Sequence, residues 1–142
     1  MRANVVARAL DTDALLREVA DAQRGATALF VGTVRSENDG REVIAIEYSA
    51  YESMAEREMS TVLTEAEAMN EGVVLVAEHR IGRLEVGEAS IAIAAAHEHR
   101  ARALDALRYA IDEIKKRAPI WKRELYADGT ESWVDPTHVA AR

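Results

Sequence analysis

Apolar residues recur every three to four positions in three segments of the chain, and this spacing predicts three amphipathic helices. The helices are expected at residues 12–23, 51–70 and 100–117. Apolar or alternating runs between them predict strands, because residues two apart on a strand point to the same face. The strands are expected at 4–8, 25–34, 42–49, 73–79 and 89–96, with a short element at 82–87 and a closing hairpin at 123–134.

The order of these elements predicts an α+β fold. Hairpin-type connections recur where a doubly wound fold would have helical crossovers, so we expect a mixed or largely antiparallel sheet packed against helices. The segment 25–34 is apolar on both faces, as in a central strand, and we expect it to pair with 42–49 through the polar loop 35–41. The 142 residues are expected to form a single domain, 1–142, with a flexible tail at 135–142.

The composition excludes several classes of function. A net charge of -7 disfavours binding to nucleic acid, which usually requires a basic face, and binding to anionic membranes. The first residues lack the apolar core of a signal peptide, and no apolar run approaches the ~20 residues of a membrane helix. We therefore expect a cytoplasmic protein. The chain contains no cysteine, so it supplies neither a thiol nucleophile nor a zinc-thiolate site.

One short segment is strongly basic in this acidic chain. Residues 115–123 carry five cations and no anion, and they lie around the predicted end of a helix and Pro119. Cations in a last helical turn are often explained by the helix dipole alone, which they stabilise by about 0.3–1 kcal/mol. That explanation does not reach Lys122 and Arg123, which follow the proline. The segment therefore favours an anionic ligand.

Other cationic side chains follow predicted strands. Arg35 follows one strand, and His99 and Arg100 follow another. If these ends lie on one side of the sheet with Lys115 and Lys122, they form a pocket for a phosphate-bearing ligand, because arginine binds phosphate oxygens in a bidentate manner. Neighbouring cations disfavour each other's charged form, so this arrangement also suits a lysine that acts as a base or nucleophile.

Two other interpretations of these residues stay open. The first is a non-catalytic α+β module that binds an anion or a protein partner through the same cations. The second is a metallohydrolase, because His97 and His99 share a face at one strand end and His79 ends a neighbouring predicted strand, so that three imidazoles are available for an open zinc site. Arg80 and Arg100 argue against the metal site, since they would repel a cation.

Four parts of the sequence resemble the large, catalytic subunit of molybdopterin synthase. They are Phe30-Val31-Gly32-Thr33-Val34-Arg35, His79-Arg80-Ile81-Gly82 followed by Gly87-Glu88, His99-Arg100, and the segment KKRAPIWKRE from Lys115 to Glu124. They occur in the family's order and spacing, and the match runs from about Gly25 to Val134. The resemblance implies an α/β-hammerhead with an additional α+β part, and a sulfurtransferase of molybdenum cofactor biosynthesis that converts cyclic pyranopterin monophosphate into molybdopterin.

The resemblance also implies partners. A small ubiquitin-like subunit would bring each sulfur as a thiocarboxylate on its C-terminal Gly-Gly tail, which is consistent with a catalytic chain without cysteine. The large subunit would form a homodimer within a heterotetramer. No metal and no dissociable cofactor is expected.

Nine residues acquire expected roles from the resemblance. Lys115 and Lys122 would be the catalytic pair and would also contact the substrate. The other substrate-binding residues would be Thr33, Val34 and Arg35 around the pterin phosphate, His99 and Arg100 on phosphate and polar edge groups, and Arg123 and Glu124 in the wall beside Lys122. Fixed cations there would stabilise negative charge that grows on oxygen as the cyclic phosphate opens.

Two features depart from the resemblance. His97 and Glu98 stand where many relatives have small residues, so the edge of the pocket gains a titratable group of undetermined role. The tail offers only His138 or Arg142 in place of the arginine that some relatives send into the neighbouring subunit's site. The sequence leaves both points open, together with the individual roles of Lys115 and Lys122.

Overall fold

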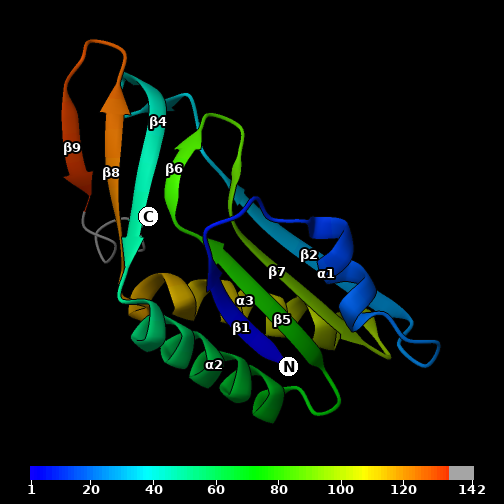
Figure 1. Cartoon of the computed structure of the whole chain (residues 1–142). Coiled ribbons are helices and arrows are strands. Elements are labelled where there is room, and N and C mark those ends of the chain that lie inside the picture. Colours follow the sequence, from blue (N-terminus) through cyan, green and yellow to red (C-terminus); the bar gives the residue numbers. More distant parts are fainter. Residues whose placement is uncertain (135–142) are drawn as a thin grey trace.

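Residues 1–134, the part of the chain that this computed structural model describes, form two β-sheets and three helices (Figure 1). The helices are α1 (Thr12–Val19), α2 (Glu52–Met69) and α3 (Arg100–Arg117). No helix among these residues is long and apolar enough to cross a membrane. The predicted tail 135–142, with His138 and Arg142, lies outside the described residues.

The first sheet has four strands in the order β1-β5-β7-β2. Their bounds are β1 (Arg2–Val6), β5 (Val74–Arg80), β7 (Ala89–His97) and β2 (Ala26–Thr33). Strand β1 is parallel to β5, and the other pairs are antiparallel. Helices α2 and α3 pack on one face and α1 packs on the other, so both faces of β7 are buried (Figure 1). This double burial explains the continuous apolar run of β7.

The second sheet contains the strands β3-β4-β8-β9, and β6 also pairs with β4. Their bounds are β3 (Glu37–Asn38), β4 (Arg41–Ala50), β6 (Gly82–Glu85), β8 (Ile120–Tyr126) and β9 (Glu131–Val134). The predicted closing hairpin is confirmed as β8 and β9, with Gly129 at φ +86° in the turn. A positive φ suits glycine, which has no Cβ to clash with the backbone.

Two predictions about strand pairing are wrong. Strand β2 lies at the edge of the first sheet, although it was expected to be central, and it does not pair with β4. Residues 37–42 instead form a local hairpin, in which Asp39 and Gly40 have φ values of 51° and 77°. A two-residue turn of this kind joins adjacent strands. The turn sets β4 antiparallel to β3, and β4 then pairs with β8 within the second sheet.

The predicted bounds of α2 and α3 are confirmed to within a residue at each end, whereas α1 ends four residues before its predicted end. Leu104 is an apolar residue of α3 that the helix does not bury, since its side chain is 54% exposed. Alanines 103, 106 and 110 are buried in its place. Their small side chains form the face of α3 that packs against α2 and the sheet.

Candidate functional site

A cavity of about 160 Å³ lies where the two sheets meet the last turn of α3. It is lined by Gly32, Thr33, Arg35, Glu37, Asn38, Ile46, Tyr48, Ser90, Lys115, Lys122 and Glu124. Wider surface hollows of about 860 and 800 Å³ lie between β1 and α2 and at the far end of the first sheet. Neither contains the predicted lysines, so the small cavity is the candidate site.

Lys115 and Lys122 reach this cavity from two elements that meet at Pro119. Lys115 lies in the last turn of α3, and the chain turns at Pro119 into β8, where Lys122 lies opposite Tyr48 of β4. Burial, and after it the positive charge of Lys122, lower the pKa of Lys115. The cavity therefore contains an amine that releases its proton more readily than an ordinary lysine.

Glu124 is a buried acidic residue that lines the cavity, where Glu37 is the other. Its side chain is 3% exposed, and its Oε1 accepts hydrogen bonds from Asn38 Nδ2 at 2.7 Å and from the Tyr126 hydroxyl at 2.9 Å. Successive side chains of β8 point to opposite faces of the sheet. Lys122 and Glu124 therefore face the cavity, whereas Arg123, which lies between them, faces the other side.

Four of the predicted site residues do not line the cavity of the single chain, and Arg123 and Val34 are two of them. Arg123 points to the opposite face of β8, where it pairs with Glu47 and with Glu131. Val34 is buried in the hydrophobic core, and its backbone N–H donates to the Glu88 carbonyl at 3.0 Å. Neither side chain lines the cavity of the single chain, and their contact with a substrate stays a prediction. Thr33 and Arg35 do line it.

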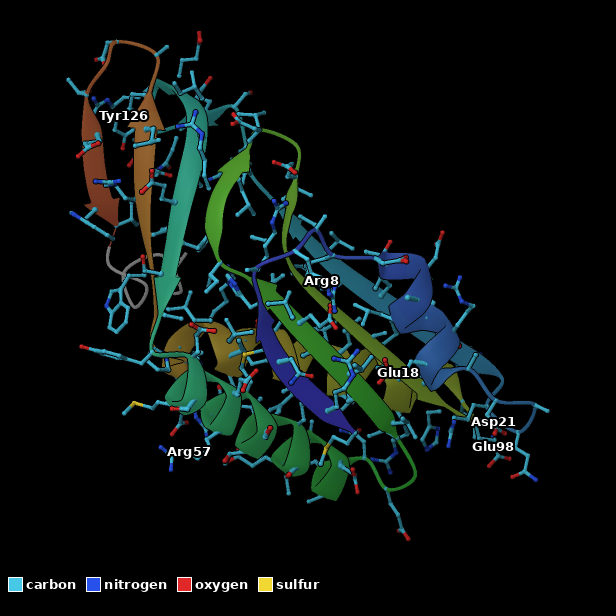
Figure 2. The ribbon with its side chains drawn as sticks, in the orientation of Figure 1. Arg8, Glu18, Asp21, Arg57, Glu98 and Tyr126 are labelled. Atoms are coloured by element: carbon cyan, nitrogen blue, oxygen red, sulfur yellow. The ribbon has the colours of Figure 1, made fainter. Side chains whose placement is uncertain are left out.

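His99 and Arg100 lie at the opposite end of the first sheet. Strands β2 and β7 are antiparallel, so Arg35, which follows β2, lies near the beginning of β7, whereas His99 and Arg100 follow its end. About 22 Å of helix separates Arg100 from Lys115 at 1.5 Å per residue. Figure 2 shows the two ends, with Glu98, next to His99, at one end of the molecule and Tyr126 of β8 at the other. The condition that these strand ends share one side of the sheet is therefore not met within one chain.

The three histidines do not form a metal site. His79 lies opposite Ile91, near the beginning of β7, whereas His97 ends that strand. The Nδ1 of His97 accepts a hydrogen bond from the His99 backbone N–H at 2.9 Å, so its Nε2 donates to the Glu71 carbonyl at 3.0 Å. Both ring nitrogens of His97 are thus engaged. In residues 1–134, no group of three or more histidine, aspartate or glutamate side chains is arranged to hold a metal ion.

His79 is instead a buried neutral imidazole behind the cavity. Its Nδ1 donates to the Arg80 carbonyl at 2.9 Å, and its ring packs in an edge-to-face arrangement with the Tyr48 ring, the centroids 5.0 Å apart. Burial, with a smaller contribution from the charge of Lys115, lowers its pKa to about 4. His79 therefore supports Tyr48, which lines the cavity, without adding positive charge.

Six residues that line the cavity were not predicted as site residues, and Asn38, Tyr48 and Ser90 are three of them. Asn38 lies in a polar loop, and Tyr48 and Ser90 lie in strands where the pattern indicates only core positions. Burial raises the pKa of Tyr48, a change that a hydrogen bond with Ser90 partly opposes, so the phenol stays protonated. The Ser90 hydroxyl donates to the Gly32 carbonyl at 3.2 Å. Only the alternation of Tyr48 with neighbouring apolar residues on β4 signalled that it faces inward.

Comparisons with known sequences identify relatives of one kind. A family model described as "MoaE protein" matches residues 5–117. The chain is 44% identical over 124 residues to the molybdopterin synthase catalytic subunit of Oryza sativa subsp. indica, an alignment that covers 87% of this chain and 64% of that protein. The identity to the molybdopterin synthase catalytic subunit of Bacillus subtilis (strain 168) is 39% over 125 residues, covering 88% and 79% of the two chains. The chain thus spans less than two thirds of the rice protein's length.

Solved structures agree with these sequences. Molybdopterin synthase from Staphylococcus aureus matches with a TM-score of 0.89 at 31% identity, covering 93% of this chain and 96% of that one. A complex of subunits 1 and 2 of the molybdopterin-converting factor from Helicobacter pylori matches with a TM-score of 0.77 at 27% identity, covering 94% and 90%. The α+β fold class predicted from the sequence is confirmed by these matches.

Proposed function

The chain belongs to the MoaE family, and we propose that it acts as the catalytic subunit of a molybdopterin synthase. In this role it transfers sulfur to cyclic pyranopterin monophosphate and so forms the dithiolene of molybdopterin, in molybdenum cofactor biosynthesis. A cytoplasmic location is part of the proposal.

The observation that carries this proposal is the convergence of Lys115, Lys122 and Arg35 on one half-buried cavity of a chain with net charge -7. Sulfur addition and opening of the cyclic phosphate both build negative charge on oxygen. Fixed cations in a site that excludes most water stabilise such charge more strongly than cations in bulk water. The cavity therefore has the electrostatics that this reaction requires.

The two lysines receive different roles in this proposal. We assign proton transfer to Lys115, because its lowered pKa increases the fraction of neutral amine near pH 7. We assign charge stabilisation on the opening phosphate to Lys122. Thr33 and Arg35, which line the same cavity, bind the substrate beside them.

A second copy of the chain completes the site in this proposal. The cavity of one chain, about 160 Å³, is smaller than the ~300–1,000 Å³ of most small-molecule pockets. His99 and Arg100 lie too far from the lysines of their own chain to share a ligand with them. A homodimer that sets the His99 end of one copy against the cavity of the other would supply the missing phosphate contacts.

The sulfur comes from a small subunit in this proposal. The chain has no cysteine, so the transferred sulfur arrives on another molecule. The Helicobacter pylori structure, described as a complex of subunits 1 and 2, supports a small-subunit partner. We infer a ubiquitin-like protein whose C-terminal Gly-Gly thiocarboxylate enters the cavity, and a heterotetramer with two copies of each chain.

The test combines the purified chain, a thiocarboxylated small subunit and cyclic pyranopterin monophosphate, and measures molybdopterin as its fluorescent oxidation product. We expect product only when all three components are present. The matched control is the same small subunit with an ordinary C-terminal carboxylate, which binds without delivering sulfur. If the complex forms but no product appears with a small subunit of proven competence, the chain is a binding module and the proposal is wrong.

A further inference from the structure

The hairpin of β3 and β4 carries part of the cavity wall but has little intrinsic support. Strand β3 is two residues long and, within residues 1–134, pairs only with β4, through Glu37 opposite Glu42 and Asn38 opposite Arg41. Arg35 lies two residues before this hairpin, and Glu37 and Asn38 line the cavity with it. The position of this wall therefore depends on contacts that the hairpin makes with the rest of the second sheet.

Those contacts converge on one buried carboxylate. Asn38 Nδ2 and the Tyr126 hydroxyl both donate to the same oxygen, Oε1 of Glu124, at 2.7 and 2.9 Å. Glu124 is 3% exposed, and a buried carboxylate requires such donors, because burial without them is strongly unfavourable. One hydrogen bond thus comes from the hairpin and the other from β8, the strand that carries Lys122.

Strand β4, the second strand of the hairpin, also contacts Tyr126. The guanidinium of Arg41 lies 3.6 Å from the centre of the Tyr126 ring. Burial and the hydrogen bond to Glu124 raise the pKa of Tyr126, so its hydroxyl remains a donor. Asn38 on β3 and Arg41 on β4 therefore both contact the pair formed by Glu124 and Tyr126.

We propose that Asn38, Glu124 and Tyr126 form a latch, a set of hydrogen bonds that positions Arg35 and the loop around it against Lys122. Glu124 acts through this latch and does not contact the substrate. Its Oε1 is already engaged by two donors, of which Asn38 comes from the cavity wall and Tyr126, on the same strand as Glu124, also contacts Arg41 of the hairpin. This inference rests on the proposed function, because sulfur transfer is the activity by which the latch is measured. It assigns roles to Asn38 and Tyr126, which the sequence did not identify as site residues.

The test compares two sets of variants. Asn38→Ala and Tyr126→Phe each remove one donor to Glu124, and each is expected to raise KM for cyclic pyranopterin monophosphate about tenfold, the effect of one lost hydrogen bond to a charged group. Their kcat should fall by about threefold or less, because the lysines remain. Glu124→Gln keeps an acceptor oxygen for both donors and should stay within about threefold of the unmodified protein. A loss in Glu124→Gln as large as in Glu124→Ala would overturn the latch and assign the role to the negative charge.

Coupling between the residues is the second measurement. In the Glu124→Ala background, Asn38→Ala is expected to change KM by less than about twofold, since its partner is already absent. Additive losses would show that Asn38 acts independently, which contradicts the latch. The matched control is Tyr109→Phe, which removes a hydroxyl that donates to Glu65 at 2.6 Å between α3 and α2, away from the cavity. It should leave KM unchanged.

Amide hydrogen exchange separates this inference from the proposed function. Asn38→Ala and Tyr126→Phe should speed exchange at residues 36–43 at least about tenfold while α2 and α3 keep their protection. This result does not depend on catalysis, so it supports the latch even if no molybdopterin is formed. Unchanged exchange in the hairpin, together with unchanged KM in an active enzyme, would refute it.

Discussion

Lys115 and Lys122 face the same cavity, and burial together with the charge of Lys122 lowers the pKa of Lys115. The two ammonium groups come from elements only a few residues apart, the end of α3 and the beginning of β8. The turn at Pro119 places them together, and the same turn leaves Lys116 exposed on the helix surface, where it pairs with Glu113 at 3.3 Å. This arrangement leads to several predictions.

Removal of either cavity lysine should abolish sulfur transfer. We expect Lys115→Ala and Lys122→Ala each to lower the single-turnover rate by a factor of about 10² or more, the usual range for a general acid or base or for an electrostatic donor. Lys116→Ala is the matched control, since it removes the adjacent, exposed charge, and it should retain the full rate. Circular dichroism and binding of the small subunit would show that the variants are folded. Retained activity in both cavity variants would contradict the assigned site.

Charge at Lys122 should control the pH dependence of the reaction. Because the charge of Lys122 lowers the pKa of Lys115, replacement of Lys122 by methionine raises that pKa. If neutral Lys115 is the base, the rising limb of the rate against pH should shift to higher pH in the residual activity of Lys122→Met. If the rising limb lies at the same pH in the unmodified protein and in Lys122→Met, Lys115 is not the titrating base.

The buried ammonium of Lys115 should reduce stability near neutral pH. Its pKa is lower in the folded chain than in the unfolded chain, so between the two values the unfolded chain binds more protons and stability rises with pH. At pH 7 the penalty for the buried charge is present. We therefore expect Lys115→Met to raise the melting temperature by a few degrees while it abolishes activity. An unchanged or lower melting temperature would contradict the inferred cost of burial.

His79 should make the fold sensitive to mild acid. Its folded pKa is about 4, against an ordinary value of 6.5, so stability is lost as the pH falls from about 6.5 towards 4. The full loss is about 3 kcal/mol, since one pKa unit corresponds to about 1.4 kcal/mol. The free energy of unfolding, measured with urea at pH 7.5, 6 and 5, should depend clearly less on pH in His79→Gln than in the unmodified protein. A pH dependence as steep in His79→Gln as in the unmodified protein would contradict this prediction.

Mixed dimers would test whether a second copy completes the site. Lys115→Ala and Arg100→Ala should each be inactive as homodimers. If Arg100 serves the cavity of the other copy, a mixed dimer has one intact site and one doubly altered site. Random exchange between equal amounts of the two variants should then restore about a quarter of the unmodified activity, because half of the dimers are mixed and each has one active site of two. No recovery after demonstrated exchange would mean that Arg100 acts within its own chain or elsewhere.

Local patterns in the sequence were sufficient for the helices, the closing hairpin and the cationic segment. The bounds of α2 and α3 follow from a spacing of three to four residues, because each helix has one face turned towards the core. The cationic segment was recognised because Lys122 and Arg123 follow a proline, where a helix dipole offers no explanation for their charge, and the family resemblance then implied a catalytic role for Lys115 and Lys122. These features depend on neighbours within a few positions along the chain.

Pairing between distant segments could not be obtained in this way. The apolar run of β2 is equally compatible with a central and an edge strand, and its neighbour β7 lies more than fifty residues further along the chain. The antiparallel register of that pair separates Arg35 from His99 and Arg100, although all three follow strands. The alternation of β8 likewise sends Arg123 to Glu47 and leaves Lys122 and Glu124 facing the cavity.

The amino-acid order therefore contains the chemistry of the site, its cations and the absence of cysteine, and it specifies which segments are helices and strands. The cavity itself and the contacts of Asn38, Tyr48 and Ser90 within it arise from the packing of the two sheets and α3. The physical reason is the distance along the chain over which each interaction acts. Periodicity and capping depend on residues a few positions apart. The pairing of a strand depends on the total burial and hydrogen bonding of the folded chain, which cannot be obtained from a local segment.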